Sequence, residues 1–381
     1  MADALITRIF ETHSLRAVSH ILQACAGYSD ITRLSAETCD LPAPLLAELH
    51  AYFENANAAQ LPSWADTARI DDAADVFREH QFTTYIVMAG ATLPECYISR
   101  DIASILGVTH RMDDDAHRRI IETLQFFILI MTPGSLTGTE RPGVLDIHKI
   151  RLMHAAIRHL IRQRQAADAS ASHHQLAKRL ISGRYGETSP INQCVMALTL
   201  QTFSYVIIRG LTQLGVDLTK QQQDDYIHTW SVVGHLLGID DDLLPNDVDQ
   251  ARDLFTLLKQ RQRAQTAHGS QLERSLLRFT ESLLPWYLRT IPRQITFDLM
   301  GEDDCAFLGL GTASRIARLW NVLPLQMAHL LNRRYRLPIA GQSRHPHACE
   351  YVARHLLSKL AALPSSENGR AFELPDHLRT F

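Results

Sequence analysis

Apolar residues recur every three or four positions along most of this chain, and this spacing restricts its fold more than any other feature of the sequence. A repeat of this kind is typical of amphipathic α-helices. Runs in which β-branched residues alternate with polar ones between turn signals are nearly absent, so few segments are suited to form a sheet. We therefore expect an all-α architecture.

The pattern divides the chain into helices joined by polar loops. The expected helices cover residues 43–53, 73–80, 98–106, 113–131, 144–165, 174–181, 193–215, 220–238, 247–267, 271–284, 316–334 and 348–363. Residues 54–72 are expected to form a loop. Neither an internal repeat nor a strong linker is present, so we expect one helical body rather than separate domains. Within it we expect an N-terminal helical extension (1–80), a central core (81–290) and a C-terminal helical segment packed on that core (291–381).

The composition is that of an ordinary globular protein, and it argues against two kinds of partner. Of the 381 residues 46% are hydrophobic, and the formal net charge is -3, so no overall positive field attracts a nucleic acid. The longest apolar stretch, residues 124–131, is far shorter than the roughly 20 residues of a membrane-spanning helix. We expect neither a nucleic-acid partner nor a transmembrane segment.

The cysteines and the first residues of the chain give an expectation about location. The six cysteines are scattered, without a CxxC pair or a CxxCH haem-attachment sequence, which favours free thiols in a reducing compartment. Glu11 and His13 interrupt the segment in which a secretory signal needs an apolar core. We therefore expect a cytoplasmic protein.

The helix expected over residues 144–165 carries a polar stripe. Arg151, His154 and Arg158 lie at i, i+3 and i+7, on one face of that helix. Two nearby cations favour the neutral imidazole, which is the form that binds a metal, and the guanidinium groups could pair with carboxylates of a cofactor. A solvated basic face explains the same pattern, and the spacing alone does not choose between the two interpretations.

The helix expected over residues 113–131 gathers three polar side chains on one face. Arg119, Glu122 and Thr123 lie at i, i+3 and i+4, among residues that are mostly apolar. One interpretation is an exposed ion pair worth roughly a few tenths of a kcal/mol. The other is a set of polar groups presented to a pocket.

Five segments between residues 89 and 254 follow one another in a distinctive order. They read AGATLPECYISRDIASILGVTHRM, RIIET, IRLMHAAIRHL, SPINQCVMALTLQTFS and DDYIHTWSVVGHLLGIDDDLLP. In order and wording they resemble the rubber oxygenases, also called latex-clearing proteins. That family belongs to a wider haem oxygenase superfamily, which includes fungal enzymes that cleave isoprenoid side chains.

The resemblance implies a noncovalent haem b in a globin-like helical core with additional N- and C-terminal helices, so that residues 81–290 become the haem-binding catalytic core. The family's RxxHAxxR helix carries the proximal iron ligand on its histidine. This histidine corresponds to His154, with Arg151 and Arg158 beside it. The absence of a CxxCH sequence agrees with noncovalent binding.

The family's distal helix has an RxxKT pattern, and this chain departs from it at one position. Arg119 and Thr123 match, but Glu122 occupies the place of the lysine. A glutamate there could ligate ferric iron, hold a water or accept a proton. The family also uses a distal glutamate base further upstream. Glu95 is the nearest glutamate in a suitable region, but we expect it to be a loop residue without such a role.

The resemblance leads to a first hypothesis, a haem-dependent oxygenase that acts with dioxygen on an apolar, terpenoid or unsaturated small molecule. Leu124, Phe127 and Ile128 would line the substrate space, unless they are plain core residues. Rubber itself is a less suitable substrate, because the chain lacks an export signal. A peroxygenase or dehydratase-like haem enzyme, and a haem or dioxygen sensor without turnover, are the alternatives. The oligomeric state is left open.

Three further residues have simple structural interpretations. Asn192 follows Pro190 and precedes a helical segment, so it is expected to cap that helix. His228 and His235 lie seven positions apart on one helical face, where they could form a second metal site or belong to the core and surface.

Overall fold

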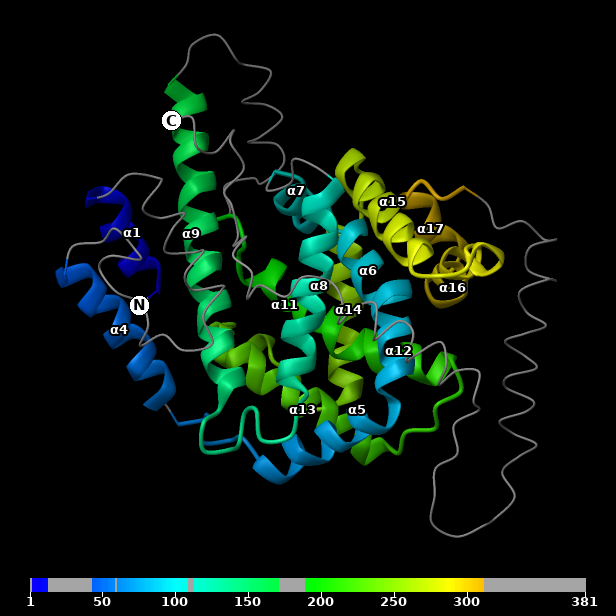
Figure 1. Cartoon of the computed structure of the whole chain (residues 1–381), viewed down its shortest axis with the longest axis horizontal. Helices are drawn as coiled ribbons and strands as arrows, with labels where there is room; N and C mark the ends of the chain where they lie inside the picture. The colour runs from blue at the N-terminus through cyan, green and yellow to red at the C-terminus, as the bar shows by residue number, and fades with distance from the viewer. Residues whose placement is uncertain (1, 13–42, 59, 109–112, 171–188, 312–381) are drawn as a thin grey trace.

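The computed structural model describes residues 2–12, 43–58, 60–108, 113–170 and 189–311 (Figure 1). Within these ranges the protein consists of helices, with a single isolated β-bridge between Ser99 and Arg263 and no strand. The all-α prediction is therefore confirmed. The helices expected over 174–181, 316–334 and 348–363 lie outside the described residues.

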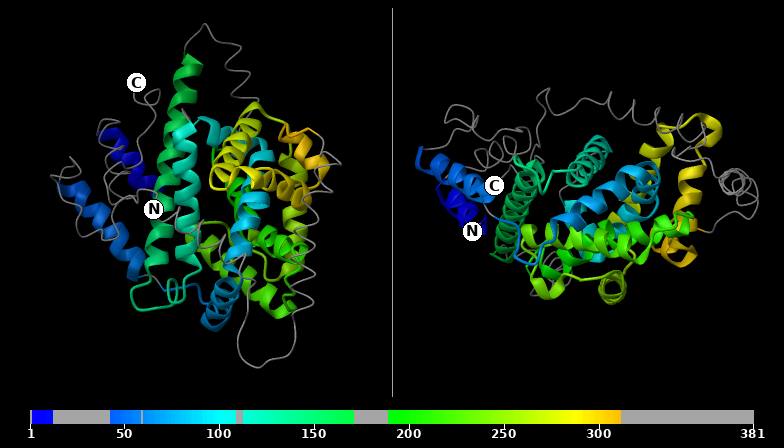
Figure 2. Two further views of the ribbon diagram at one scale, coloured as in Figure 1. Left: turned by 45° about the vertical axis from the view of Figure 1, so that its right-hand side comes forward. Right: turned by 90° about the horizontal axis from the view of Figure 1, so that it is seen from below.

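The main body contains most of the described helices. They are α5 (Thr67–Val87), the π-helical turn η2 (Met88–Thr92), α6 (Leu93–Ile98), α7 (Arg100–Val108), α8 (Asp113–Ile130), α9 (Pro142–Ser170), α11 (Gln193–Phe203), α12 (Tyr205–Gln213), α13 (Lys220–Leu237), the 3-10 turn η3 (Asp241–Leu243), α14 (Val248–Gln262), α15 (Ala267–Ser282), the 3-10 turn η4 (Trp286–Leu288), α16 (Ile291–Met300) and α17 (Glu302–Phe307). Two N-terminal helices, α1 (Ala2–Thr12) and α4 (Ala43–Ala58), lie together at one side of α9 (Figures 1 and 2).

The helix ends follow from local side-chain chemistry. The Asn192 side chain accepts a hydrogen bond from the backbone N–H of Val195, so the predicted cap of α11 is confirmed. Thr219 and Gln222 form a capping box at the start of α13, and Gly238 ends that helix in a left-handed conformation.

Helix α9 separates two hydrophobic cores. One face of it packs against α1 and α4 through Leu152, Ala155 and Ala156. Another face carries Val144, Ile147 and Ile161 into the main core, which extends from α5 to the residues after α17. Since the helical period is 3.6 residues, these two sets of positions point in different directions from the axis. α9 therefore joins the N-terminal helices to the main body.

Some element boundaries differ from those expected. The loop expected over 54–72 is wrong in part, because α4 continues to Ala58 and α5 begins at Thr67, capped by the Asp66 side chain. α5 runs through a kink at His80, which is where the N-terminal extension was expected to end, and continues into η2. The helix expected over 193–215 is interrupted at Ser204, whose φ of -105° and ψ of -81° are not helical.

One apolar stretch in the described part of the chain, Gln193–Gln213, is long enough and apolar enough to cross a membrane. However, 67% of its most apolar window is buried inside the protein. Length and composition are weak evidence for a membrane span when the segment is a core helix of this kind.

An aromatic cluster joins α8 to three other helices in the main core. The Phe127 ring is fully buried, with its centroid 5.4 Å from Trp230 in a stacked arrangement and 5.5 Å from Phe77 in an edge-to-face one. Phe203 contacts both rings of the stacked pair, with its centroid 5.6 Å from Trp230 and 6.2 Å from Phe127. Such pairs add about 0.5–1.5 kcal/mol to the effect of burial.

We expect the substitution Phe127→Leu to lower the free energy of unfolding by about 1 kcal/mol, because it removes ring contacts and leaves a small cavity. Urea unfolding of the full chain measures this loss. Leu257→Ala is the control, since the Leu257 side chain is 65% exposed and its truncation should change stability little. A Phe127→Leu variant as stable as the control would contradict the packing described.

Candidate functional site on helices α8 and α9

The face of α9 that points into the main core has polar residues at its centre. Arg151, His154 and Arg158 occupy the same stripe as the buried Ile147 and Ile161, which lie seven residues before and after His154. This stripe is therefore not simply a solvated basic face, which was one of the two interpretations that the spacing left open. All three polar side chains are partly buried.

Arg151 is held against the C-terminal end of α13. Its Nη1 donates to the carbonyl oxygen of Leu236 at 3.2 Å, where the negative end of the helix dipole favours a cation. Its guanidinium also lies against Gly238, where a Cβ atom would be 3.0 Å from Arg151 Cζ. Gly238 has a φ of +89°, which favours glycine.

We expect Gly238→Ala to destabilise the protein more than Gly311→Ala. Both glycines have positive φ, so each substitution should cost about 1 kcal/mol in backbone strain. Only at Gly238 does the added methyl group also meet Arg151, which should add about 1 kcal/mol, because Gly311 has nothing within 4 Å. Urea unfolding measures both losses, and equal values would contradict the close packing of Arg151 on Gly238.

Arg158 connects α9 with two other parts of the chain. Its Nε and Nη2 donate to the two carboxylate oxygens of Asp3 at 2.9 Å and 3.1 Å, and its Nη1 donates to the Ile191 carbonyl oxygen at 3.2 Å. Its fork is thus already engaged by a carboxylate of α1. Arg158 acts on His154 through its charge.

The His154 imidazole has no hydrogen bond among the described residues, and its Nδ1 is buried. Burial and, to a smaller extent, the charge of the Arg158 guanidinium together lower the pKa of His154 to about 4. The ring is therefore neutral at physiological pH, as the sequence predicted. The two arginines do not share this effect as expected, because Arg151 acts on His148 instead, whose pKa is lowered to about 4 by burial and, to a smaller extent, by the Arg151 charge.

Helices α8 and α9 lie side by side and antiparallel, joined by residues 131–141 (Figures 1 and 2). An α-helix rises about 1.5 Å per residue. Measured along the helix axes, Arg119 therefore lies about 17 Å from the C-terminal end of α8, and His154 lies about 18 Å from the N-terminal end of α9. The two residues are therefore at the same level along the helix pair.

The three polar residues of α8 differ in burial. Arg119 and Thr123 are partly buried on one edge of the core-facing stripe, whereas Glu122 lies farther round the helix and is exposed. Arg119 also interacts electrostatically with Tyr97 of α6. Burial and the nearby Glu273 raise the pKa of the Tyr97 phenol, and the charge of Arg119 opposes this rise. The structure thus groups Arg119 and Thr123 and leaves Glu122 at the surface.

The apolar residues of α8 expected to line a substrate space also separate. Phe127 belongs to the buried aromatic cluster and is a core residue. Leu124 and Ile128 are only partly buried, as is Ile120 one turn earlier. Ile157 on α9 is likewise partly buried. Part of the apolar surface of this helix pair is therefore not covered by the described protein.

Glu95 is neither a loop residue nor a neighbour of His154. It lies in α6 with its side chain 1% exposed, and its carboxylate accepts from Arg209 Nη2 and from Lys259 Nζ, each at 2.9 Å. The interpretation as a loop residue is wrong. These ion pairs also occupy the carboxylate, so it is unsuited to the role of a distal base.

A different glutamate, Glu273 in α15, is the buried carboxyl that sequence analysis missed. Its side chain has no exposed surface, and neither of its oxygens has a hydrogen-bond partner among the described residues. Burial raises the pKa of Glu273 to about 8. The sequence contained a signal, since Glu273 precedes Leu276 and Leu277 by three and four positions and so shares their apolar face.

His228 and His235 do not form a metal site in the described structure. His228 Nε2 accepts a hydrogen bond from the Asp66 backbone N–H at 2.9 Å, and the Trp64 ring lies edge-on between the two imidazoles. His235 pairs with Asp241 at 2.7 Å. Throughout the described ranges no group of three or more His, Cys, Asp or Glu residues is arranged to hold a metal ion. Any metal on His154 therefore needs ligands from outside the chain's own described residues.

Comparison with known protein families agrees with the resemblance found in the sequence. Residues 81–328 match the family "ER-bound oxygenase mpaB/B'/Rubber oxygenase, catalytic domain". This chain belongs to that family of oxygenases, and the match extends beyond the segments from which the resemblance was drawn.

Two individual proteins support this membership. The Rubber oxygenase of Streptomyces sp. (strain K30) is 25% identical over 341 residues, which are 88% of this chain and 77% of that protein. A solved structure of latex clearing protein LCP in the closed state aligns with a TM-score of 0.70 and 20% identity, covering 98% of this chain and 93% of the other. At this level of identity the structural match shows a shared helical fold.

Proposed function

We propose that this protein is a haem b-dependent oxygenase that acts with dioxygen on an apolar, unsaturated small molecule. The observation that carries the proposal is His154, a neutral imidazole without hydrogen bonds at the centre of the core-facing stripe of α9. Membership in an oxygenase family supports the reaction class. The location in the cytoplasm stays a prediction.

The residues present suit a haem group in three respects. A neutral imidazole is the form that ligates iron. Most of the Arg158 fork is engaged by Asp3, but Arg151 donates only through Nη1 among the described contacts, so its other donors could meet a propionate. Ile120, Leu124 and Ile157 offer partly uncovered apolar surface to a flat apolar ring.

In this proposal each residue has a separate task. Haem b, when bound, supplies dioxygen binding and activation at its iron. His154 would ligate the iron, and burial, together with the Arg158 charge, favours the neutral form of that ring. Arg119 and Thr123 would supply a cation and a hydroxyl donor on the opposite side, at the level of His154. Glu122 would hold or accept a proton at its carboxylate near the solvent.

The apolar residues of α8 support an apolar substrate. Leu124 and Ile128 are partly buried on α8, but at about 100° per residue they lie about 100–180° round that helix from Thr123 and Arg119. An alkene whose double bond lies near Arg119 and Thr123 would therefore contact them only with the part of its chain that lies away from this polar pair. Burying the substrate there would also exclude water from the reaction. The relative from Streptomyces is named for rubber, and we propose a smaller molecule of related chemistry as the substrate here.

The test is oxygen uptake by the haem-reconstituted full-length protein. We expect a Soret band that reports stoichiometric haem and oxygen consumption that depends on an added small alkene such as squalene. Polyisoprene latex serves as the comparison substrate. A protein that stays colourless after haem supplementation would contradict the cofactor, and one that binds haem without consuming oxygen on either substrate would contradict the oxygenase reaction.

A further inference from the structure

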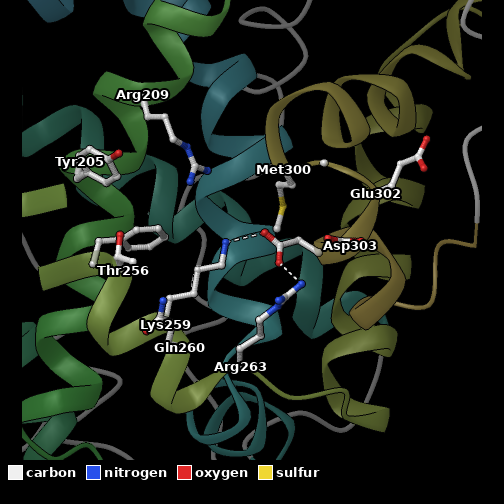
Figure 3. A pocket seen from close by; sticks show the side chains of 12 residues that line it. Tyr205, Arg209, Thr256, Lys259, Gln260, Arg263, Met300, Glu302 and Asp303 are labelled. Atoms are coloured by element: carbon white, nitrogen blue, oxygen red, sulfur yellow. Dashed lines mark hydrogen bonds and ion pairs between the residues drawn. The ribbon is translucent and has the colours of Figure 1, made fainter. Parts of the chain in front are cut away.

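A pocket lies between α12, α14, α16 and α17 (Figure 3). These helices lie away from α9 (Figure 1). The volume of the pocket is about 540 Å³, which is within the usual range for small-molecule sites. None of the residues assigned to the proposed haem site lines it. Figure 3 shows Arg209, Lys259 and Arg263 reaching into the pocket from α12 and α14, with Met300 facing them from α16.

The floor of this pocket is a chain of alternating charges. Glu95 binds Arg209 and Lys259, with 2.8 Å between Lys259 Nζ and Glu95 Oε2. Asp304 binds Lys259 at 2.6 Å and Arg263 at 2.7 Å. Three cations thus share two carboxylates, so the floor carries one positive charge in excess. The five side chains are between 1% and 30% exposed.

Two hydrogen-bond donors of this group have no acceptor. The Nε atoms of Arg209 and Arg263 are buried and unpartnered among the described residues. A buried donor without an acceptor costs about 1–3 kcal/mol, and more when it is charged. Because these two atoms have almost no exposed surface, a ligand in the pocket would not reach them, and the excess positive charge of the five side chains is what indicates an anionic ligand.

The walls of the pocket restrict which anion would fit. Phe255 is buried beneath Arg209 and Lys259, whose charged atoms lie 5.6 Å and 5.4 Å from its ring centroid. Met300 adds a second apolar surface, while Glu302 and Asp303 are exposed at the rim. The apolar walls suit an organic tail, and the acidic rim would repel an anion of high charge.

We propose that this pocket binds a small organic acid with one carboxylate and a short apolar or aromatic tail. The carboxylate would lie near Arg209 and Lys259 and compensate the single excess charge. The tail would contact Phe255 and Met300. The site is separate from the proposed haem site, so the proposal does not depend on the haem hypothesis.

Isothermal titration of the full-length protein with benzoate tests this site. We expect benzoate to bind in the millimolar range or tighter, and its neutral isostere benzamide, together with citrate and inorganic phosphate, to bind at least about tenfold more weakly. Binding of benzamide with equal affinity would overturn the role of the charge. Citrate or phosphate binding as tightly as benzoate would overturn the assignment to a monocarboxylate, and no benzoate binding would overturn the site itself.

A matched pair of variants locates the binding. Thr256→Glu adds a negative charge to the pocket wall, and Leu257→Glu adds the same charge at the next position of α14, which is 65% exposed and does not line the pocket. We expect Thr256→Glu to weaken benzoate binding at least about tenfold and Leu257→Glu less than about twofold. Gln260→Glu, at another exposed lining position, repeats the test if Thr256→Glu does not fold. Equal affinities in the pocket and control variants would overturn the proposal.

Discussion

Replacing His154 with alanine is expected to reduce the haem retained after gel filtration at least about tenfold, because the only proposed protein ligand to the iron is lost. The ratio of Soret absorbance to protein absorbance measures the retained haem. Added imidazole should restore part of the band, since it can occupy the space that the side chain leaves.

His148→Ala is the control for this experiment. His148 lies on the same helix as His154, and its pKa is also lowered to about 4, mainly by burial. However, it does not lie on the core-facing stripe of α9 that carries Ile147, His154 and Ile161. Both ring nitrogens of His148 are buried without partners. We expect this variant to keep its haem. If His148→Ala loses haem and His154→Ala retains it, the iron ligand is His148 and not His154.

Replacing Glu273 with glutamine is expected to stabilise the protein increasingly as the pH rises. Burial raises the pKa of Glu273 to about 8, so the folded state favours the protonated carboxyl. The stability of the native chain is then highest below the unfolded pKa of about 4.5 and falls as the pH rises through about 8. Glutamine does not ionise, so its side chain adds no such pH dependence. As the pH rises from about 5.5 to 8.5, the free energy of unfolding of the variant should increase by on the order of 2–3 kcal/mol relative to that of the native chain.

Urea unfolding of both proteins at several pH values measures this difference. Comparing the two at each pH cancels the contribution of His148 and His154, whose lowered pKa values act in the opposite direction and reduce stability as the pH falls below about 6.5 toward 4. Glu281→Gln, at a partly exposed position of the same helix, is the control. If the gain of Glu273→Gln over the native chain does not change with pH, the pKa of Glu273 is not raised within the fold as described.

The parts of the structure that the sequence predicted depend on contacts within one helix. The core-facing stripe of α9 could be read from its spacing, because residues three, four and seven positions apart share a face whatever the rest of the fold. The cap at Asn192 was predictable for the same reason. Glu273 carried a similar local signal in its spacing from Leu276 and Leu277, and was overlooked.

The parts that were not predicted depend on contacts between distant segments. The partners of Glu95, Arg209 and Lys259, are 114 and 164 positions away in the chain. No local pattern reveals such a pairing. Similarly, Arg158 looked available to a cofactor from its helical spacing, whereas tertiary packing brings Asp3 into its fork. The break at Ser204 was hidden because the apolar period continues on both sides of it.

The π-helical turn η2 has a consequence for the charges that follow it. A π turn holds one more residue than an α turn, so deleting one residue from Met88–Thr92 would restore the ordinary period and rotate α6 by about 100° relative to α5. Glu95 would then point away from Arg209 and Lys259 and leave three cations with one carboxylate. The additional residue thus sets the phase between two successive helices, and we expect single-residue insertions or deletions in this turn to be poorly tolerated.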